Sequence, residues 1–201
     1  MASLIHHLRR LAEQTSWQGL WLALIASLLT LAGGLAWATR LYAQSGFSPR
    51  LIEGQLAFDA ALTRSWYGAL IEQDTLDIYW RTQWVDFIFI AGLLATLFIL
   101  HLIIAKARRN EPDWQRLALW LAVLGPAIAT ADIWENLLTL MMLSAPTSFP
   151  VWLATLASIL SAVKWGWAVI GTSLVVVQLI ALAWHRMGGA QAARKTHSSD
   201  P

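Results

Sequence analysis

The chain contains no cysteine among its 201 residues. Disulfides, thiolate metal sites and thiol-based catalysis are therefore excluded, and cysteine usage says nothing about the redox state of the compartment. The sequence also lacks HExxH, GxSxG, P-loop and CxxC motifs, which mark several common classes of metalloprotease, hydrolase, nucleotide-binding protein and redox protein. These absences leave no short motif from which an enzymatic activity could be inferred.

Charged residues are also scarce, at 13% of the chain, whereas hydrophobic residues make up 57%. Soluble domains contain about 25% charged and about 45–50% apolar residues. The formal net charge is only +2, and the basic residues lie at the ends of apolar runs, so we do not expect a nucleic-acid partner. The composition predicts an integral membrane protein whose first partner is the lipid bilayer.

Four apolar runs are long enough to cross a bilayer core of about 30 Å, which takes about 20 helical residues. With their flanks, they predict spans at about 17–42, 84–106, 115–144 and 151–185. We therefore expect an all-α fold, a bundle of four transmembrane helices over residues 17–187. A cytoplasmic interfacial segment at 1–16 should precede it, and a disordered cytoplasmic tail at 188–201 should follow.

The first apolar run, at residues 17–39, is longer than the core of about 7–15 residues that a secretory signal peptide contains. Ala36 and Ala38 loosely resemble a small-residue cleavage site, and cleavage there is the alternative that this length disfavours. A retained first span is the interpretation that the length favours.

Lysine and arginine divide unequally between the two sides of the predicted spans. One side holds nine of them: Arg9, Arg10, Lys106, Arg108, Arg109, Arg116, Arg186, Arg194 and Lys195. The other side holds four: Arg40, Arg50, Arg64 and Arg81. Because cytoplasmic loops carry the excess of basic residues, we expect both termini in the cytoplasm, with the protein in a plasma membrane such as the bacterial inner membrane.

Residues 43–83 form the one sizeable segment outside the predicted spans, on the extracytoplasmic side. Ser48 and Pro49 are typical of a helix N-cap and first helical residue. Apolar residues then recur at helical spacing: Leu51, Phe58, Leu62, Trp66 and Leu70. This amphipathic helix would either lie on the lipid headgroups or cover the bundle as a lid, and the length of the last two spans favours the lid.

Ionisable residues interrupt the third and fourth apolar runs. Asp132, Glu135 and Asn136 share one helical face, because offsets of three and four residues stack on a helix. Lys164 shares its face of the fourth span with small residues, which permit close helix approach. With Asp86 at the start of the second span, these residues form the predicted site, which we call the polar cluster.

The members of the polar cluster are expected at similar heights in the membrane. At 1.5 Å per residue, Asp132 lies about 24 Å from Arg116, Glu135 about 28 Å from the same arginine and Lys164 about 33 Å from Arg186. An unpaired charge at the bilayer centre costs about 2.5–3.5 kcal/mol, so we expect Lys164 to pair first with Asp132. The surplus carboxylates require a proton, a ligand, or a cation such as Arg64 or Arg81.

Three function classes fit these residues. The leading interpretation is a non-enzymatic subunit that binds a membrane-protein partner or forms a homodimer, with the polar cluster as a structural clasp or docking point. The second is a carrier or receptor for a small polar or cationic solute, including proton-coupled transport. The third is a lipid-modifying enzyme with a carboxylate as general base. No cofactor or metal is expected, since His101 and His185 lack any further signature of a haem site.

Overall fold

The computed structural model describes residues 2–197, with the exception of the side chains of residues 2, 127–129 and 185–197. It contains seven helices and, over residues 2–197, no β-strand. In chain order these are α1 Ala2–Gln14, α2 Trp17–Ser45, α3 Leu51–Gln55, α4 Ala60–Glu72, α5 Leu76–Ala107, α6 Pro112–Leu143 and α7 Val151–His197. The expected all-α fold is therefore what the structure contains.

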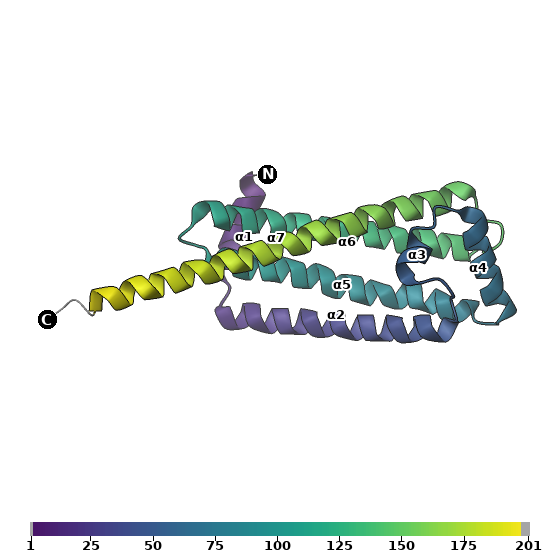
Figure 1. Cartoon of the computed structure of the whole chain (residues 1–201), viewed down its shortest axis with the longest axis horizontal. Coiled ribbons are helices and arrows are strands. Elements are labelled where there is room, and N and C mark those ends of the chain that lie inside the picture. Colours follow the sequence, from purple (N-terminus) through teal and green to yellow (C-terminus); the bar gives the residue numbers. More distant parts are fainter. Residues whose placement is uncertain (1, 198–201) are drawn as a thin grey trace.

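Four of these helices, α2, α5, α6 and α7, are long and apolar enough to cross a membrane. They run along the long axis of the molecule, as Figure 1 shows. Helices α3 and α4 lie at one end of this bundle, which we call the α3–α4 end, and α1 lies at the other, the α1 end. The far part of α7 also extends beyond the α1 end, so the two ends of the described chain lie on the same side of the bundle.

The four long helices pack in the order α2, α5, α6, α7, each against the next. Helices α2 and α5 approach each other closely, since a Cβ added to Gly92 would lie 2.4 Å from the backbone nitrogen of Leu31. A Cβ on Gly34 would lie 2.6 Å from the nitrogen of Phe89. Small residues at these two points let the helix backbones meet, as is typical of membrane helices. A hydrogen bond of 3.1 Å from Thr96 Oγ1 to Ser27 Oγ adds a polar contact to the same interface.

At the α3–α4 end, the expected single helix is two helices, α3 and α4, separated by residues 56–59. The prediction was wrong at this point because Phe58 adopts a positive φ of 52°, which a helix does not allow, and Asp59 starts a new helix. The Asp59 carboxylate accepts hydrogen bonds from the Ala61 and Leu62 amides. The predicted cap at Ser48 is also wrong, since Arg50 precedes α3 without a side-chain cap.

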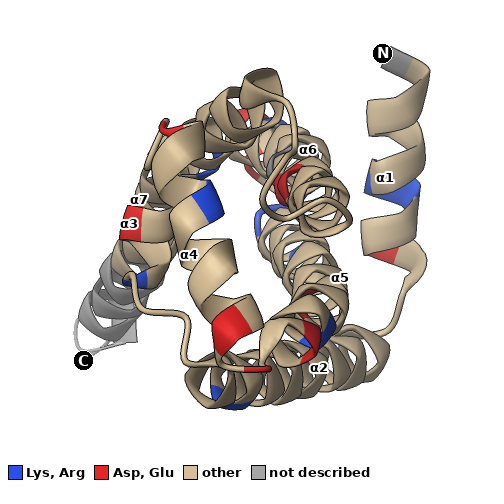
Figure 2. Ribbon diagram, turned by 90° about the vertical axis from the view of Figure 1, so that its right-hand side faces the viewer, with Lys and Arg blue, Asp and Glu red and all other residues tan. Residues whose placement is uncertain are grey.

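Helix α4 packs against α5 and α7 and crosses the end of the bundle (Figure 2). Its buried residues are Ala60, Thr63, Tyr67 and Leu70, which are mostly not the apolar residues that the sequence pattern singled out. Leu51, Phe58 and Leu62 are instead exposed. Because one face of α4 is buried against the bundle, the structure favours a lid over the bundle and not a helix that lies on the lipid headgroups.

Two further boundaries differ from expectation. Helix α5 begins at Leu76, so residues 76–83 of the predicted outer segment extend the second long helix instead. Helix α7 continues to His197, and residues 188–197, expected to be disordered, are helical. Alanine, glutamine, arginine and lysine in this stretch are strong helix formers, which explains the continuation past two glycines. Residues 198–201 lie outside the described part of the chain.

At the α1 end, α1 packs against α5 and α6 through the buried side chains of Leu8 and Ala12. Lys106 of α5 donates hydrogen bonds to the carbonyls of Ala12, Glu13 and Thr15, at 3.2, 3.0 and 2.5 Å. A cation at a helix C-terminus satisfies carbonyls that have no partner within the helix. The predicted interfacial segment is thus a helix fixed to the bundle.

Candidate functional site

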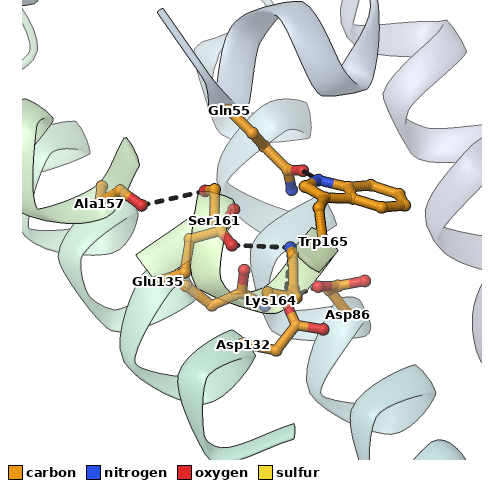
Figure 3. Close-up of polar contacts among 9 residues, drawn as sticks. Gln55, Asp86, Asp132, Glu135, Ala157, Ser161, Lys164 and Trp165 are labelled. Carbon is orange, nitrogen blue, oxygen red and sulfur yellow. Dashed lines mark hydrogen bonds and ion pairs between the residues drawn. The ribbon is translucent and has the colours of Figure 1, made fainter. Parts of the chain in front are cut away.

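The structure brings all five residues of the polar cluster together from three helices (Figure 3). Helix α5 supplies Asp86, α6 supplies Asp132, Glu135 and Asn136, and α7 supplies Lys164. On α6 the offsets of three and four residues place the acids and the amide on one face, toward α5 and α7. The cluster therefore lies where the three helices meet.

Lys164 is bound to two carboxylates of α6. Its Nζ lies 2.9 Å from Asp132 Oδ1 and 2.7 Å from Glu135 Oε2. The three side chains are 13%, 6% and 5% exposed, in that order. Because these charges are largely removed from solvent, each depends on the others for compensation, and the lysine links α7 to α6.

Asp86 has a different partner. Its Oδ2 accepts a hydrogen bond of 2.7 Å from Asn136 Nδ2. Among the described side chains, no lysine or arginine forms an ion pair with Asp86. When ionised, the cluster therefore holds three carboxylates and one ammonium, with Asp86 as the carboxylate that a neutral amide satisfies.

Neither of the arginines considered as an additional cation reaches the cluster. Arg64 donates a hydrogen bond to the Phe149 carbonyl and lies over the Phe149 ring, 5.1 Å from its centroid. Arg81 pairs with Asp77 on its own helix, at 3.0 Å, where both side chains are exposed. Arg64 thus attaches α4 to the segment between α6 and α7, and the excess of carboxylates in the cluster is uncompensated by either arginine.

The cluster lies at the edge of a cavity of about 430 Å³, within the range of about 300–1,000 Å³ typical of small-molecule sites. Residues from every described helix except α1 line it. All five members of the polar cluster contribute, together with Thr39, Gln55, Thr63, Thr82, Gln83, Thr139, Ser158 and Ser161. The remaining wall is apolar or aromatic. The cavity thus combines a charged region with apolar walls.

All three tyrosines of the chain, Tyr42, Tyr67 and Tyr79, line this cavity. Their rings pack with Phe47, whose centroid lies 4.4 Å from that of Tyr79 and 6.1 Å from that of Tyr67. These residues were not among the predicted site residues. The signal that could have found them is compositional, since the chain has 13 tryptophans and only three tyrosines.

Three buried polar side chains of the cavity wall, those of Tyr67, Gln83 and Thr139, have no hydrogen-bond partner among the described residues. Tyr67 is 2% exposed, Gln83 and Thr139 are each 9% exposed, and all three line the cavity. Burial, and secondarily the charge of Glu135, raise the pKa of Tyr67 well above its usual range. Its hydroxyl therefore remains neutral at neutral pH, so it can donate a hydrogen bond and its oxygen can accept one.

One side of the cavity is closed by contacts between α3, the 56–59 segment and α7. Trp165 Nε1 donates a hydrogen bond of 2.9 Å to Gln55 Oε1 (Figure 3), and the Phe58 amide donates one of 3.2 Å to Ser158 Oγ. Helix α3 has no buried residue. These two hydrogen bonds are therefore a large part of what holds this segment against α7.

Among the described residues, no group of three or more histidine, cysteine, aspartate and glutamate side chains has the arrangement of a metal site. His101 is buried, with Nδ1 2.7 Å from the Leu97 carbonyl, and it does not line the cavity. The side chain of His185 lies outside the described residues.

The fold and site define an all-helical protein with four helices able to span a membrane and an internal cavity with a charged edge. No family model, curated protein or solved structure matches the chain. The argument about function therefore rests on the residues of the cavity.

Proposed function

We propose that the protein is a membrane-embedded receptor or carrier for a small molecule with a cationic group. The observation that carries this proposal is the charge balance at the edge of the cavity. Three carboxylates face one ammonium, and that ammonium is already held by Asp132 and Glu135. A ligand amine beside Asp86 would offset the excess of negative charge in a region where uncompensated charge is costly.

The rest of the cavity wall is suited to the remainder of such a ligand. Aromatic and aliphatic side chains supply apolar contact, and the Tyr67 hydroxyl and the Gln83 amide are free to form hydrogen bonds. Sites of this kind typically join a mainly apolar surface to a few fixed polar groups. The clasp interpretation is compatible with this proposal, because Lys164 links α6 to α7 while Asp86 remains for the ligand.

We further propose that the α3–α4 end is extracytoplasmic. The excess of lysine and arginine on the opposite side supports this orientation, and both α1 and the far part of α7 lie toward that opposite, α1 end. The cavity would then lie in the outer half of a plasma membrane, and α3 and α4 would cover it from outside.

The test compares octylamine with octanol on the purified chain in nanodiscs of neutral phosphatidylcholine. The two molecules share a chain and differ in charge, and each Kd is measured by competition against a diazirine-labelled dodecylamine. We expect octylamine to bind at least about tenfold more tightly, since an ion pair with a buried carboxylate is worth more than a neutral hydrogen bond. Asp86→Asn should remove that preference.

The matched control is Asp77→Asn, on the same helix, since Asp77 is exposed and pairs with Arg81. This variant should retain the preference for the amine. Equal affinity of the wild-type chain for octylamine and octanol would contradict the proposal.

A second candidate function is that of a partner-binding or assembly subunit. Helix α7 supports it, because this is the least buried of the four long helices, with exposed Val163, Val169 and Val176 along its length. Native mass spectrometry from mild detergent tests it: co-purification of a second protein or copy that Val169→Glu removes would favour this candidate. A monomer with bound amine would favour the first.

A further inference from the structure

The first and last long helices, α2 and α7, lie on either side of the cavity without an extensive contact between them. Each long helix packs on the next in the order α2, α5, α6, α7, and α2 and α7 are not among the packed pairs. Both nevertheless line the cavity, α2 with Leu35 and Thr39 and α7 with Trp165 and Ala168. No extensive helix–helix contact therefore closes the bundle on the side between α2 and α7.

The residues at this opening show that it faces outward. Leu35 lines the cavity and is 53% exposed, and Thr39 is also both exposed and part of the wall. About 15 Å of helix separates Leu35 from Ser45 at the end of α2. In a bilayer, a side chain at that depth on a spanning helix faces hydrocarbon and not water.

Polarity changes along the path from this opening to the cluster. Leu35 and Ala168 at this side of the cavity are apolar, as are Phe89 and Leu93, which lie one and two helical turns from Asp86 on α5. A molecule that enters between α2 and α7 therefore meets apolar side chains before it reaches a carboxylate. This gradient suits an amphiphile with an apolar chain and one charged end.

A water-soluble amine would have a different route, through the cover at the α3–α4 end. There α4 buries Tyr67 and Leu70 against the bundle, and α3 is held to α7 by the hydrogen bond between Gln55 and Trp165. The α3–α4 end of the cavity is thus covered, whereas its lateral side has no extensively packed helix pair.

Two observations independent of the acidic residues indicate a ligand in this cavity. The Tyr67 hydroxyl and the Gln83 amide are at least nine-tenths buried, they line the cavity, and within residues 2–197 their side chains form no hydrogen bond. Polar groups in such sheltered positions are normally hydrogen-bonded, so a molecule in the cavity would supply the partner that the described residues do not.

We propose that the ligand is a membrane-dissolved amphiphile with a single amine head, which enters from the bilayer between α2 and α7 and leaves its chain in that opening. This inference rests on the proposed binding of a cationic molecule at Asp86 and adds the class of ligand and its route. The amine lies beside Asp86, the Tyr67 hydroxyl and Gln83 amide contact the head, and the alkyl chain passes Leu35 and Ala168.

The experiment is a chain-length series of butylamine, octylamine, dodecylamine and octadecylamine, again in competition with diazirine-labelled dodecylamine in phosphatidylcholine nanodiscs. Affinities of the three longer amines are expressed per mole fraction in the bilayer, to remove the effect of partitioning. If the chain can extend into lipid, octadecylamine should bind within about threefold of octylamine, since the cavity sets no upper limit on length. Photolabelled peptides should come from α2 and α7.

The variant Leu35→Trp narrows the opening, and Leu29→Trp is its control, because Leu29 is exposed on the same helix and does not line the cavity. Leu35→Trp should lower the affinity for octadecylamine by about tenfold or more and the affinity for butylamine by about twofold or less. Leu29→Trp should change neither affinity.

Three outcomes are distinguishable. The lateral route is supported if the wild-type chain binds octylamine and octadecylamine with similar affinity and Leu35→Trp removes that similarity. If the short amines bind but the affinity for octadecylamine is lower than theirs by about tenfold or more, the lateral route is overturned and the proposed function stays intact. Failure of every amine to bind better than its matched alcohol would overturn the proposed function, and this inference with it.

Discussion

Lys164 is the residue on which the arrangement of α6 and α7 depends most directly. One ammonium faces two carboxylates from the same α6 face, and all three side chains are largely removed from solvent. A buried group of this kind contributes little net stability over an apolar replacement, but removal of one member leaves charge without compensation. Its main effect is to define which faces of the two helices meet.

The variant Lys164→Met should lower the free energy of unfolding by about 3–5 kcal/mol, because Asp132 and Glu135 lose their cation. Adding Asp132→Asn and Glu135→Gln to it should recover most of that loss. Thermal unfolding in detergent, with the amount of protein in membranes, measures both effects. Arg81→Met is the control, since its exposed pair with Asp77 contributes only about 0–1 kcal/mol.

A second prediction at the residue scale concerns the Tyr67 hydroxyl. Tyr67→Phe should leave thermal stability nearly unchanged, because the hydroxyl has no hydrogen-bond partner within residues 2–197 and the ring packing is kept. The affinity for octylamine should fall by a factor of about 3–10, because the variant loses one hydrogen bond, which is worth about 0.5–1.5 kcal/mol. Unchanged affinity would mean that the ligand head does not reach Tyr67.

Tyr42→Phe provides the contrast. The Tyr42 hydroxyl donates a hydrogen bond of 2.7 Å to the Pro49 carbonyl. Its loss should therefore lower stability by about 1 kcal/mol, mainly by loosening the segment between α2 and α3.

At the scale of elements, the tightest constraint is the contact between α2 and α5. Gly34 and Gly92 lie where the two backbones meet, and the neighbouring atoms are backbone atoms that cannot rotate away. This contact fixes the rotation of α5 about its own axis, and with it the direction in which Asp86 faces. The small residues of one interface therefore determine part of the geometry of the site.

Gly92→Ala should reduce the free energy of unfolding by about 1–3 kcal/mol, the usual effect of overpacking, even though alanine is the better helix former. Gly33→Ala is the matched control, because no atom lies within 4 Å of the Cβ that it would add. Comparison of their thermal unfolding midpoints tests the contact, and equal midpoints would show that α2 and α5 do not approach so closely.

At the scale of the whole molecule, the two ends of the bundle differ. The α1 end carries the basic link between α5 and α6 and the helix α1, fixed by Lys106. The α3–α4 end covers the cavity. This asymmetry gives the proposed orientation a direct experimental consequence.

Because the chain has no cysteine, single cysteines report topology without background. On intact cells, a membrane-impermeant maleimide should label Glu72→Cys at the α3–α4 end and should label Asp113→Cys only after the membrane is opened. Both positions are exposed. Labelling of Asp113→Cys alone in intact cells would reverse the orientation.

The sequence by itself determined that the chain is helical and apolar enough to span a membrane four times, because composition and run length are local quantities. It also indicated that Asp132, Glu135 and Asn136 share a face and that Lys164 reaches their level, since the helical repeat fixes both relations. The boundary between α3 and α4 escaped prediction because Phe58 adopts a conformation that few non-glycine residues take.

Only the tertiary structure decided which faces of different helices meet. Asp86 lies beside Asn136 and not beside Lys164, and Tyr42, Tyr67 and Tyr79 converge on one cavity although three helices carry them. The separation of α2 from α7 is equally non-local. The physical reason is that a helix's own periodicity says nothing about its rotation and tilt against its neighbours, which contacts such as that of Gly92 with Leu31 fix across the bundle.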